Sequence, residues 1–274
     1  MKAFPKKNGG FHGEKIGFVR TSEPLPELPK GTKYADPHIS FDGKYRYLSV
    51  GYEVPEQQEK LTVESLGIDL GIKDLAICSN GKVYRSVNRS HEVRRLEKVL
   101  KREQRKLSRM FEMNVSSYRT IGNKRTPILI KPLNECHNYQ KQKNIIKLLH
   151  RRLANIRNNY LHQTTTEIVK TKPSRIVMEA LNVKGMMKNK HLAKAIQEQK
   201  FYEFKRQITY KCLKYGISLV EVPQFYPSSK TCSCCGKIKR DLKLSDRVYR
   251  CEECGLVIDR DFNASLNLAN YQSA

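Results

Sequence analysis

The sequence predicts an α/β protein with a metal-binding insert and a strongly basic surface. Strand-like runs rich in β-branched residues alternate with long amphipathic segments, which is typical of a sheet with crossover helices. Two Cys-x-x-Cys pairs interrupt this alternation near the C-terminus. The 274 residues carry 52 Lys+Arg against 27 Asp+Glu, a formal net charge of +25. A chain of this length can bury a substantial core without disulfides.

The first part of the chain, residues 11–55, predicts a small antiparallel β module. Residues 15–20 and 45–54 alternate apolar and polar side chains, and Asp42-Gly43 is a turn signal just before the second run. Residues 57–60 are expected to form a linker.

The main sheet is expected to begin at Leu66. Residues 66–73, 75–78 and 83–84 are strand-like, and Asn80-Gly81 is a strong hairpin signal. Two basic helices follow, around 93–111 and 146–160, because apolar residues recur there every three or four positions. We expect them to pack as an antiparallel hairpin, with residues 113–134 as the connection.

The C-terminal half continues the alternation. It predicts a strand at 175–179, one helix over 192–215, a strand at 217–222 and a last helix that opens at Asp261. The cysteine-rich insert at 232–254 lies between the last strand and the last helix.

The basic charge lies in the middle of the chain. Residues 89–211 hold 30 Lys+Arg and 9 Asp+Glu. A polyanion is therefore the expected partner, since neutralised phosphates release counterions; the alternative is a solvated helical surface, as in a ribosomal or structural protein. No run of about 18 apolar residues exists and Met1–Lys7 lacks the apolar stretch of a signal peptide. We expect a cytoplasmic protein with no membrane partner.

The cysteine pairs predict one structural zinc ion. Cys232-x-x-Cys235 and Cys251-x-x-Cys254 are separated by 15 residues, and a glycine follows each pair. Each pair can direct two sulfurs at one ion, and the spacer is long enough for a hairpin that completes a closed tetrahedral site. A redox dithiol is the alternative. The other four cysteines are expected to be core or surface residues, with Cys234 pointing away from the ligands.

A second group of candidate residues is acidic. Asp69 lies in a strand between glycines, Glu179 ends a strand, and Asp259 and Asp261 lie at the start of the last helix. Close carboxylates repel unless a cation lies among them. Two magnesium or manganese ions about 4 Å apart could stabilise the attacking and leaving oxygens of a phosphodiester displacement. Taken singly, each acid is better explained as an ordinary solvated or capping residue, with Asp261 as a candidate helix N-cap; it is their shared setting that favours a metal site.

Four segments together resemble the transposon-encoded TnpB (OrfB) proteins, relatives of the type V CRISPR effector nucleases. They occur in the family's order over about residues 11–270, with the cysteine insert before the last acid. The segments are Gly67–Lys73, Met178–Met186, Tyr226–Cys232 and Asp259–Ala264.

The resemblance implies an RNase H-like (RuvC) domain that is split in sequence and preceded by a partial, wedge-like β-barrel module. Its catalytic acids correspond to Asp69, Glu179 and Asp261, with Asp259 as the alternative for the third. The implied activity is RNA-guided DNA cleavage, with a transposon-derived guide RNA and DNA as partners. The implied parts are a β module (1–56), RuvC-like part I (57–88), a basic helical hairpin (89–172), RuvC-like part II (173–227), a zinc ribbon (228–256) and RuvC-like part III (257–274).

Family members carry a further helical N-terminal segment that helps hold the guide–target duplex. This sequence starts inside the β module, so we expect an N-terminally shortened homologue.

The basic residues near the acids are expected to contact phosphates along the strand path, which positions a nucleic acid without reading its sequence. They are Lys73, Arg94, Arg102, Arg105, Arg151, Arg152, Lys184, Lys188, Lys190 and Arg206. Two other functions stay open at this point. A DNA- or RNA-binding zinc-ribbon protein needs none of the acids, whereas a strand-transferring transposase uses the same acids to join ends.

Overall fold

The computed structural model describes residues 3–6, 9–13, 17–24, 27–28, 30–53, 60–243 and 245–272. The chain divides into two compact units, one of residues 1–55 with 103–151 and the other of residues 56–102 with 152–274. The helices α1 (His91–Glu112) and α2 (His137–Lys170) contribute residues to both. In the described part of the chain, no helix combines the length and the apolar character that crossing a bilayer requires.

The first unit is built from short antiparallel strands. One sheet has the order β1-β2-β3, and β4 pairs with β5. The strands expected near 15–20 and 45–54 are present, although residues 14–16 and 54–59, which include most of the expected linker, lie outside the described residues. The bounds are β1 (Ala3–Lys6), β2 (Gly10–Gly13), β3 (Gly17–Arg20), β4 (Ala35–Phe41) and β5 (Arg46–Gly51).

Two elements of this unit were not expected from the sequence. The strand β4 contains Pro37, and its register shifts between Ala35 and His38, so the proline lies at an irregularity where its missing N–H breaks no regular ladder. The connection 113–134 holds a hairpin of β9 (Val115–Ile121) and β10 (Lys124–Leu129). Gly122-Asn123 forms its turn, and Gly122 has a φ of 58°.

The second unit contains a five-stranded sheet in the order β12-β11-β6-β7-β8. The strands β12, β11 and β6 are parallel, while β7 and β8 continue from β6 as antiparallel neighbours. The Asn80-Gly81 hairpin between β7 and β8 confirms the turn expected there. The bounds are β6 (Ser65–Leu70), β7 (Asp74–Cys78), β8 (Val83–Arg85), β11 (Arg175–Glu179) and β12 (Ser218–Val222).

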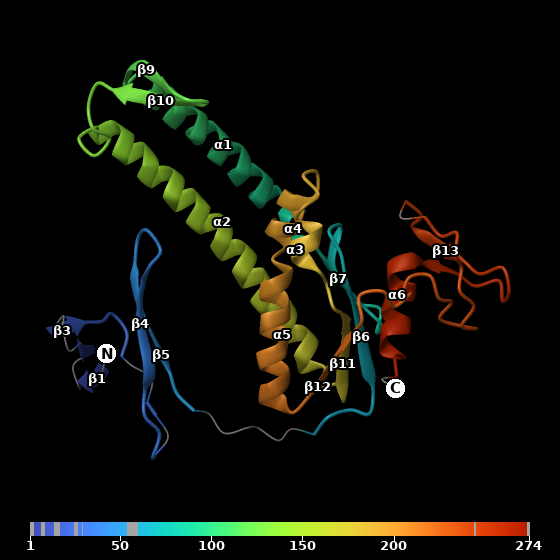
Figure 1. The fold of residues 1–274 in the computed structure, drawn as a ribbon. Coiled ribbons are helices and arrows are strands. Elements are labelled where there is room, and N and C mark those ends of the chain that lie inside the picture. The colour runs from blue at the N-terminus through green and yellow to red at the C-terminus, as the bar shows by residue number, and fades with distance from the viewer. Residues whose placement is uncertain are drawn as a thin grey trace. The chain divides into compact units, whose positions relative to one another are not determined.

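Helices cover both faces of this sheet (Figure 1). Alternate residues of β6 and β11, such as Ile68 and Met178, enter a core with side chains of α2 and of α5 (Phe201–Tyr215). On the other face, Val177 and Val222 pack against Leu268 of α6 (Arg260–Ala269). The sheet is therefore the middle of three layers, as the alternation of strands and helices predicted.

The helix expected over 192–215 is divided. It consists of α4 (Ala193–Gln199) and α5, and Lys200 between them has a left-handed backbone with φ of 54°. Its ammonium group donates a 2.6 Å hydrogen bond to the Asn158 side chain of α2, a tertiary contact that a periodic pattern cannot reveal. The shorter helices are α3 (Val183–Met186) and a 3-10 turn, η1 (Val87–Arg89).

The two long helices run antiparallel within each unit, as expected. In the second unit Arg152 pairs with Glu92 at 2.9 Å and Arg157 with Glu97 at 2.8 Å. In the first unit, the Gln142 side chain donates to the backbone and the side chain of Glu103.

Candidate active site and metal centre

The position of Asp69 follows from the close contact between β6 and α6. A Cβ atom at Gly67 would lie 2.0 Å from the Ser265 carbonyl oxygen and 2.4 Å from the Ala269 nitrogen, so only glycine allows this approach. Ser65 donates a 2.7 Å hydrogen bond to the Ala269 carbonyl. Since side chains alternate along a strand, Ser65, Gly67 and Asp69 share the face that α6 covers.

The helix α6 runs antiparallel to β6, and this brings its N-terminus to Asp69. Ala269 at the helix end lies beside Ser65, and Ser265 one turn earlier lies beside Gly67. The next turn towards the N-terminus holds Asp261, and Asp69 is the next residue on the same face of β6.

Glu179 reaches the same edge from the neighbouring strand. The strands β6 and β11 are parallel, with Val177 opposite Gly67 and Met178 opposite Ile68. Val177 packs against Leu268 of α6, so Glu179, two residues further, lies on the α6 face at the carboxyl end of its strand. The structure therefore brings Asp69, Glu179 and Asp261 to one end and one face of the sheet.

The three acids influence each other electrostatically. Burial and the negative charges of Asp261 and Glu179 together raise the pKa of Asp69 to about 8, while Arg260 opposes the shift. Burial also raises the pKa of Glu179. A raised pKa in a cluster of carboxylates means that the ionised cluster lacks a compensating positive charge, which a divalent cation could supply.

The three carboxylates lie further apart than the ligands of a single ion would. Among the described residues, His, Cys, Asp and Glu ligand atoms lie within 4.8 Å of one another in a group of three or more only at Cys232, Cys235, Cys251 and Cys254. Two ions about 4 Å apart can be shared by carboxylates with a wider separation. The donor set of three carboxylates fits magnesium or manganese, which prefer oxygen ligands.

Two arginines that sequence reasoning missed contact Asp261. The Arg260 guanidinium donates to Oδ1 from Nε and Nη2, at 2.9 and 2.8 Å, and Arg247 Nη1 lies 3.6 Å from Oδ2. These cations partly neutralise the third acid. The position of Arg260 inside the Asp-Arg-Asp motif was a signal for its role, whereas Arg247 comes from the cysteine-rich insert and gave none.

The N-cap of α6 lies two residues earlier than expected. It is Asp259, whose Oδ1 accepts 3.0 Å hydrogen bonds from the backbone nitrogens of Asp261 and Phe262. The prediction that Asp261 opens the helix was wrong, because an N-cap accepts from nitrogens two and three positions on, and these follow Asp259. Asp259 is thus engaged as a cap, and of the two acids Asp261 has the larger electrostatic effect on Asp69.

The four cysteines come together as predicted. Cys232 Sγ lies 3.6 Å from Cys254 Sγ, and Cys235 Sγ lies 3.6 Å from Cys251 Sγ. A disulfide needs about 2.05 Å, whereas a tetrahedron with Zn–S bonds of about 2.3 Å has edges near these values. Sulfur ligands at these distances fit a structural zinc ion.

Each cysteine pair sits in the same type of turn. The nitrogens of Gly236 and Gly255 donate to the carbonyls of Cys232 and Cys251, at 3.0 and 3.1 Å, and both glycines have positive φ, 77° and 73°. Backbone N–H groups of Cys254 and Glu253 lower the pKa of Cys251 to about 6, whereas burial and the neighbouring sulfurs raise the pKa values of Cys254 and Cys235. Ionisation of all four thiols therefore needs a cation among them, which zinc would supply. The fifth cysteine of the insert, Cys234, is exposed.

Two buried asparagines join the cysteine module to α6. Asn263 Nδ2 donates to the Thr231 carbonyl at 2.7 Å, and its Oδ1 accepts from the Ser233 nitrogen at 3.0 Å. Asn267, one turn later, donates to the carbonyls of Thr231 and Ser228. The chain just before Cys232 is therefore fixed to the helix that carries Asp261.

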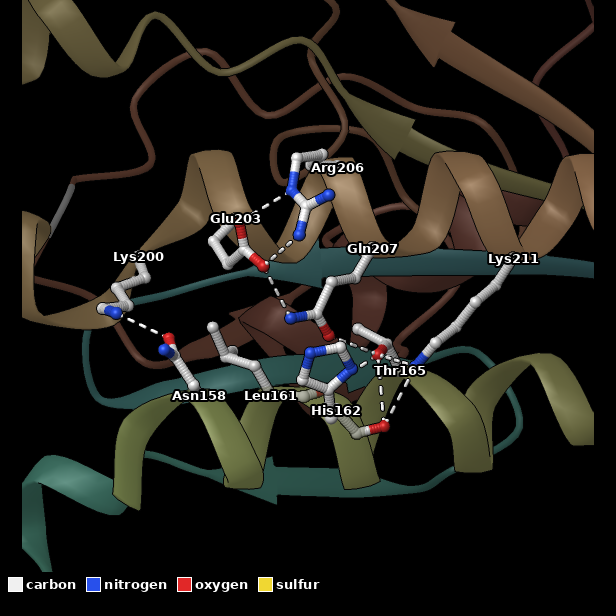
Figure 2. A network of polar contacts seen from close by, with 9 residues as sticks. All are labelled: Asn158, Leu161, His162, Thr165, Lys200, Glu203, Arg206, Gln207 and Lys211. Carbon is white, nitrogen blue, oxygen red and sulfur yellow. Dashed lines mark hydrogen bonds and ion pairs between the residues drawn. The ribbon is translucent and has the colours of Figure 1, made fainter. Parts of the chain in front are cut away.

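A polar network fixes α5 to α2 (Figure 2). Thr165 of α2 donates to Gln207, and the buried ammonium group of Lys211 donates to Thr165, Thr166 and the His162 carbonyl. On the outer side, the two hydrogen bonds from Arg206 lower the pKa of Glu203 to about 2. This network positions the exposed face of α5 next to the carboxyl end of β11.

The predicted phosphate contacts fall into two groups. Some form ion pairs inside the protein: Arg151 with Asp42, Arg152 with Glu92 and Arg206 with Glu203. Arg102 also has a partner. No ion pair involves the others within the described residues; these are Lys73, Arg94, Arg105, Lys184, Lys188 and Lys190.

The comparisons with known proteins agree with one another. Residues 49–190 match the OrfB_IS605 family model, described as “Probable transposase”, and residues 201–268 match the Cas12f1-like TNB domain. The chain is 30% identical over 272 residues to a Streptomyces pristinaespiralis protein named “Putative RNA-guided DNA endonuclease”, covering 97% of this chain and 60% of that protein. It is 32% identical over 218 residues to InsQ of Escherichia coli K12, which has the same description, covering 74% and 48%.

Among solved structures, the fold is similar to Cas12f1 in its complex with guide RNA and target DNA. The TM-score is 0.52 at 20% identity, over 81% of this chain and 42% of that one. The chain thus spans about half the length of the proteins that it matches.

Proposed function

The chain belongs to the TnpB (OrfB) family, and from this membership we propose that it is a metal-dependent, RNA-guided DNA endonuclease. The observation that carries the proposal is the convergence of Asp69, Glu179 and Asp261 on one face of the sheet, with a pKa of about 8 for Asp69. An acid that is costly to ionise without a cation fits a divalent-metal site better than a solvated surface.

The catalytic domain would be RNase H-like. The parallel centre and antiparallel β6–β7–β8 edge support this part of the proposal, with the segments 57–88, 173–227 and 257–274 contributing strands and the last helix. The basic hairpin 89–172 and the cysteine module 228–256 would be insertions into it, and the β strands of 1–56 would be part of a wedge-like module.

Asp69, Glu179 and Asp261 would hold two magnesium or manganese ions. Such ions supply an activated water and stabilise charge on the attacking and leaving oxygens of the phosphodiester. Asp69 would donate oxygen ligands from the sheet and Asp261 from the helix. Arg260 would hold the Asp261 carboxylate in one orientation through its two hydrogen bonds.

One zinc ion would be held by Cys232, Cys235, Cys251 and Cys254. With sulfur in all four positions it leaves no open position for a substrate, so its role would be to stabilise a module with a very small core around Tyr249.

DNA and a guide RNA would be the partners. The names of the similar proteins and the solved Cas12f1 complex support both, and so does the net charge of +25. The lysines and arginines without an internal ion pair, such as Arg94 and Lys188, would contact phosphates, which fixes register rather than sequence.

The proposal is tested by incubating the purified chain with labelled DNA, with and without guide RNA, in magnesium and in EDTA. We expect magnesium-dependent cut products, their loss in Asp69→Ala, and nearly unchanged DNA binding in that variant. Asp74→Asn, a control in the neighbouring strand β7, should cleave like the unmodified chain.

The DNA products of this assay also distinguish the proposed nuclease from the two alternative functions. Joined rather than cut DNA would identify a strand transferase, and salt-sensitive binding without any product would identify a binding protein. Cleavage that persists in Asp69→Ala would refute the assignment of the acid.

A further inference from the structure

A cavity of about 580 Å³ lies beside Glu179, on the face of the sheet opposite α6. Its floor is apolar and includes Met178 and Phe201, both almost fully buried. One wall is the exposed face of α5 and the other is the segment that follows β11, around Leu181 and Lys184. Glu179 lies at the boundary between this cavity and the acidic site.

The α5 wall combines aromatic rings with cations. Tyr202, Lys205, Arg206, Thr209 and Tyr210 line the cavity at helical spacings of three and four, so they form one stripe. Tyr202 is 74% exposed and Tyr210 is 41% exposed, so both rings are accessible to a ligand in the cavity. Arg206 lies 5.8 Å from the centre of the Tyr210 ring.

The cations at the rim indicate an anionic ligand. Lys184 on the opposite wall is exposed and forms no ion pair with any residue that the structure describes. Lys205 and Arg206 also line the cavity, and each pairs with a carboxylate of the chain, Glu221 and Glu203 respectively. An apolar floor, exposed rings and a cationic rim match a nucleotide, whose base is flat and apolar-faced and whose phosphate is charged.

We propose that this cavity binds one base of single-stranded DNA and so positions the adjacent phosphodiester at the acidic site. The base would stack on Tyr202 above the floor of Met178 and Phe201, and Lys184 would contact its phosphate. A base inside a duplex cannot enter a concave site of this kind, so the cavity selects an unpaired strand. This inference rests on the proposed nuclease function for its purpose, but its binding step needs no metal.

The test compares two short oligonucleotides of equal charge, pentathymidylate and the same backbone with abasic sites, in EDTA and at fixed salt. Because the two oligonucleotides carry the same number of phosphates, their non-specific electrostatic attraction to the protein is the same. The ratio of their dissociation constants therefore measures recognition of the base. We expect the unmodified chain to bind pentathymidylate about tenfold more tightly than its abasic analogue, within the range for base–aromatic stacking.

The variants identify the site. Tyr202→Ala should bind both oligonucleotides equally, whereas Tyr202→Phe, which retains the ring, should keep the tenfold preference. Phe225→Ala removes a ring that is 91% exposed and outside the cavity, and it should also keep the preference. Because Tyr202 is largely exposed, thermal unfolding of Tyr202→Ala should match that of the unmodified chain.

A chain that shows no preference, or a preference that Tyr202→Ala retains, would overturn the inference. These results do not depend on cleavage. If the nuclease proposal alone fails, base recognition at Tyr202 persists although no product forms; if the cavity inference alone fails, magnesium-dependent cleavage persists without base recognition at Tyr202.

Discussion

Gly67 of β6 faces Ser265 of α6 so closely that a Cβ atom on Gly67 would lie 2.0 Å from the Ser265 carbonyl oxygen. This contact sets the position of α6 on the sheet. Since Asp69 follows two residues after Gly67 and Asp261 precedes Ser265 by one turn, it also sets the distance between two of the acids.

Gly67→Ala should therefore weaken both the fold and the acidic site. The added methyl group meets backbone atoms, which cannot move aside as a side chain can, so we expect a loss of about 2 kcal/mol or more in unfolding free energy. Urea unfolding measures it. Ser218→Ala, at an exposed position of β12, should change stability by less than about 0.5 kcal/mol. Equal stability of the two variants would show that α6 does not rest on Gly67.

The pKa of Asp69 predicts how metal-free stability depends on pH. A carboxyl group with a raised pKa in the folded state binds its proton more tightly there, so its contribution favours folding at low pH and is lost as pH rises from about 4 to about 8. Asp69→Asn replaces the carboxyl group with an amide that does not ionise, so the variant does not lose this stability as pH rises. In EDTA the variant should be more stable than the unmodified chain at pH 8 by more than about 1 kcal/mol, because a tenfold change in proton affinity corresponds to about 1.4 kcal/mol.

Thermal unfolding between pH 5 and pH 9 tests this, with Asp74→Asn as the control in β7. Stability differences between Asp69→Asn and the unmodified chain that stay constant with pH would contradict a raised pKa for Asp69.

Removal of one zinc ligand should unfold the cysteine module selectively. Metal analysis of the purified chain is expected to give about one zinc per chain, and Cys254→Ser should lose it, since a structural site needs all four ligands. Cys234→Ser is a matched control, because Cys234 is exposed and lies between two ligands. Equal zinc content in the two variants would remove Cys254 from the site.

The asparagine contacts predict that the cysteine module and the acidic site are coupled. Asn267→Ala leaves the carbonyls of Ser228 and Thr231 without this donor in a buried place, which should cost about 1–3 kcal/mol. We expect the variant to retain zinc and to need more magnesium for cleavage, because α6 carries Asp261. Asn270→Ala, exposed just after α6, should change neither property. An unchanged magnesium requirement in Asn267→Ala would show that the two parts are independent.

The sequence was informative where a signal is local. The turn at Asn80-Gly81, the strands of the main sheet and the cluster of four cysteines each follow from a short motif with a direct physical reason. The acids could also be named, although only the structure places Glu179 and Asp69 on one face, through the parallel register of β6 and β11.

The predictions that the structure corrects fail mainly because they depend on contacts between residues far apart in the chain. The break at Lys200 depends on its bond to Asn158 of another helix, and the strand β4 tolerates Pro37 only because its register shifts there. The hairpin of β9 and β10 could have been found, since Gly122-Asn123 is a two-residue turn signal. The contact of Arg247 with Asp261 could not, because 13 residues, including the second cysteine pair, lie between them in the chain.

The most direct test of the account is a manganese titration followed by electron paramagnetic resonance, which measures free and bound ions without requiring cleavage. We predict about two bound Mn²⁺ ions per chain, with affinity reduced at least tenfold in each of Asp69→Asn, Glu179→Gln and Asp261→Asn and unchanged in Asp74→Asn. Manganese binding that is the same in all five proteins would show that these three acids do not form a shared metal site.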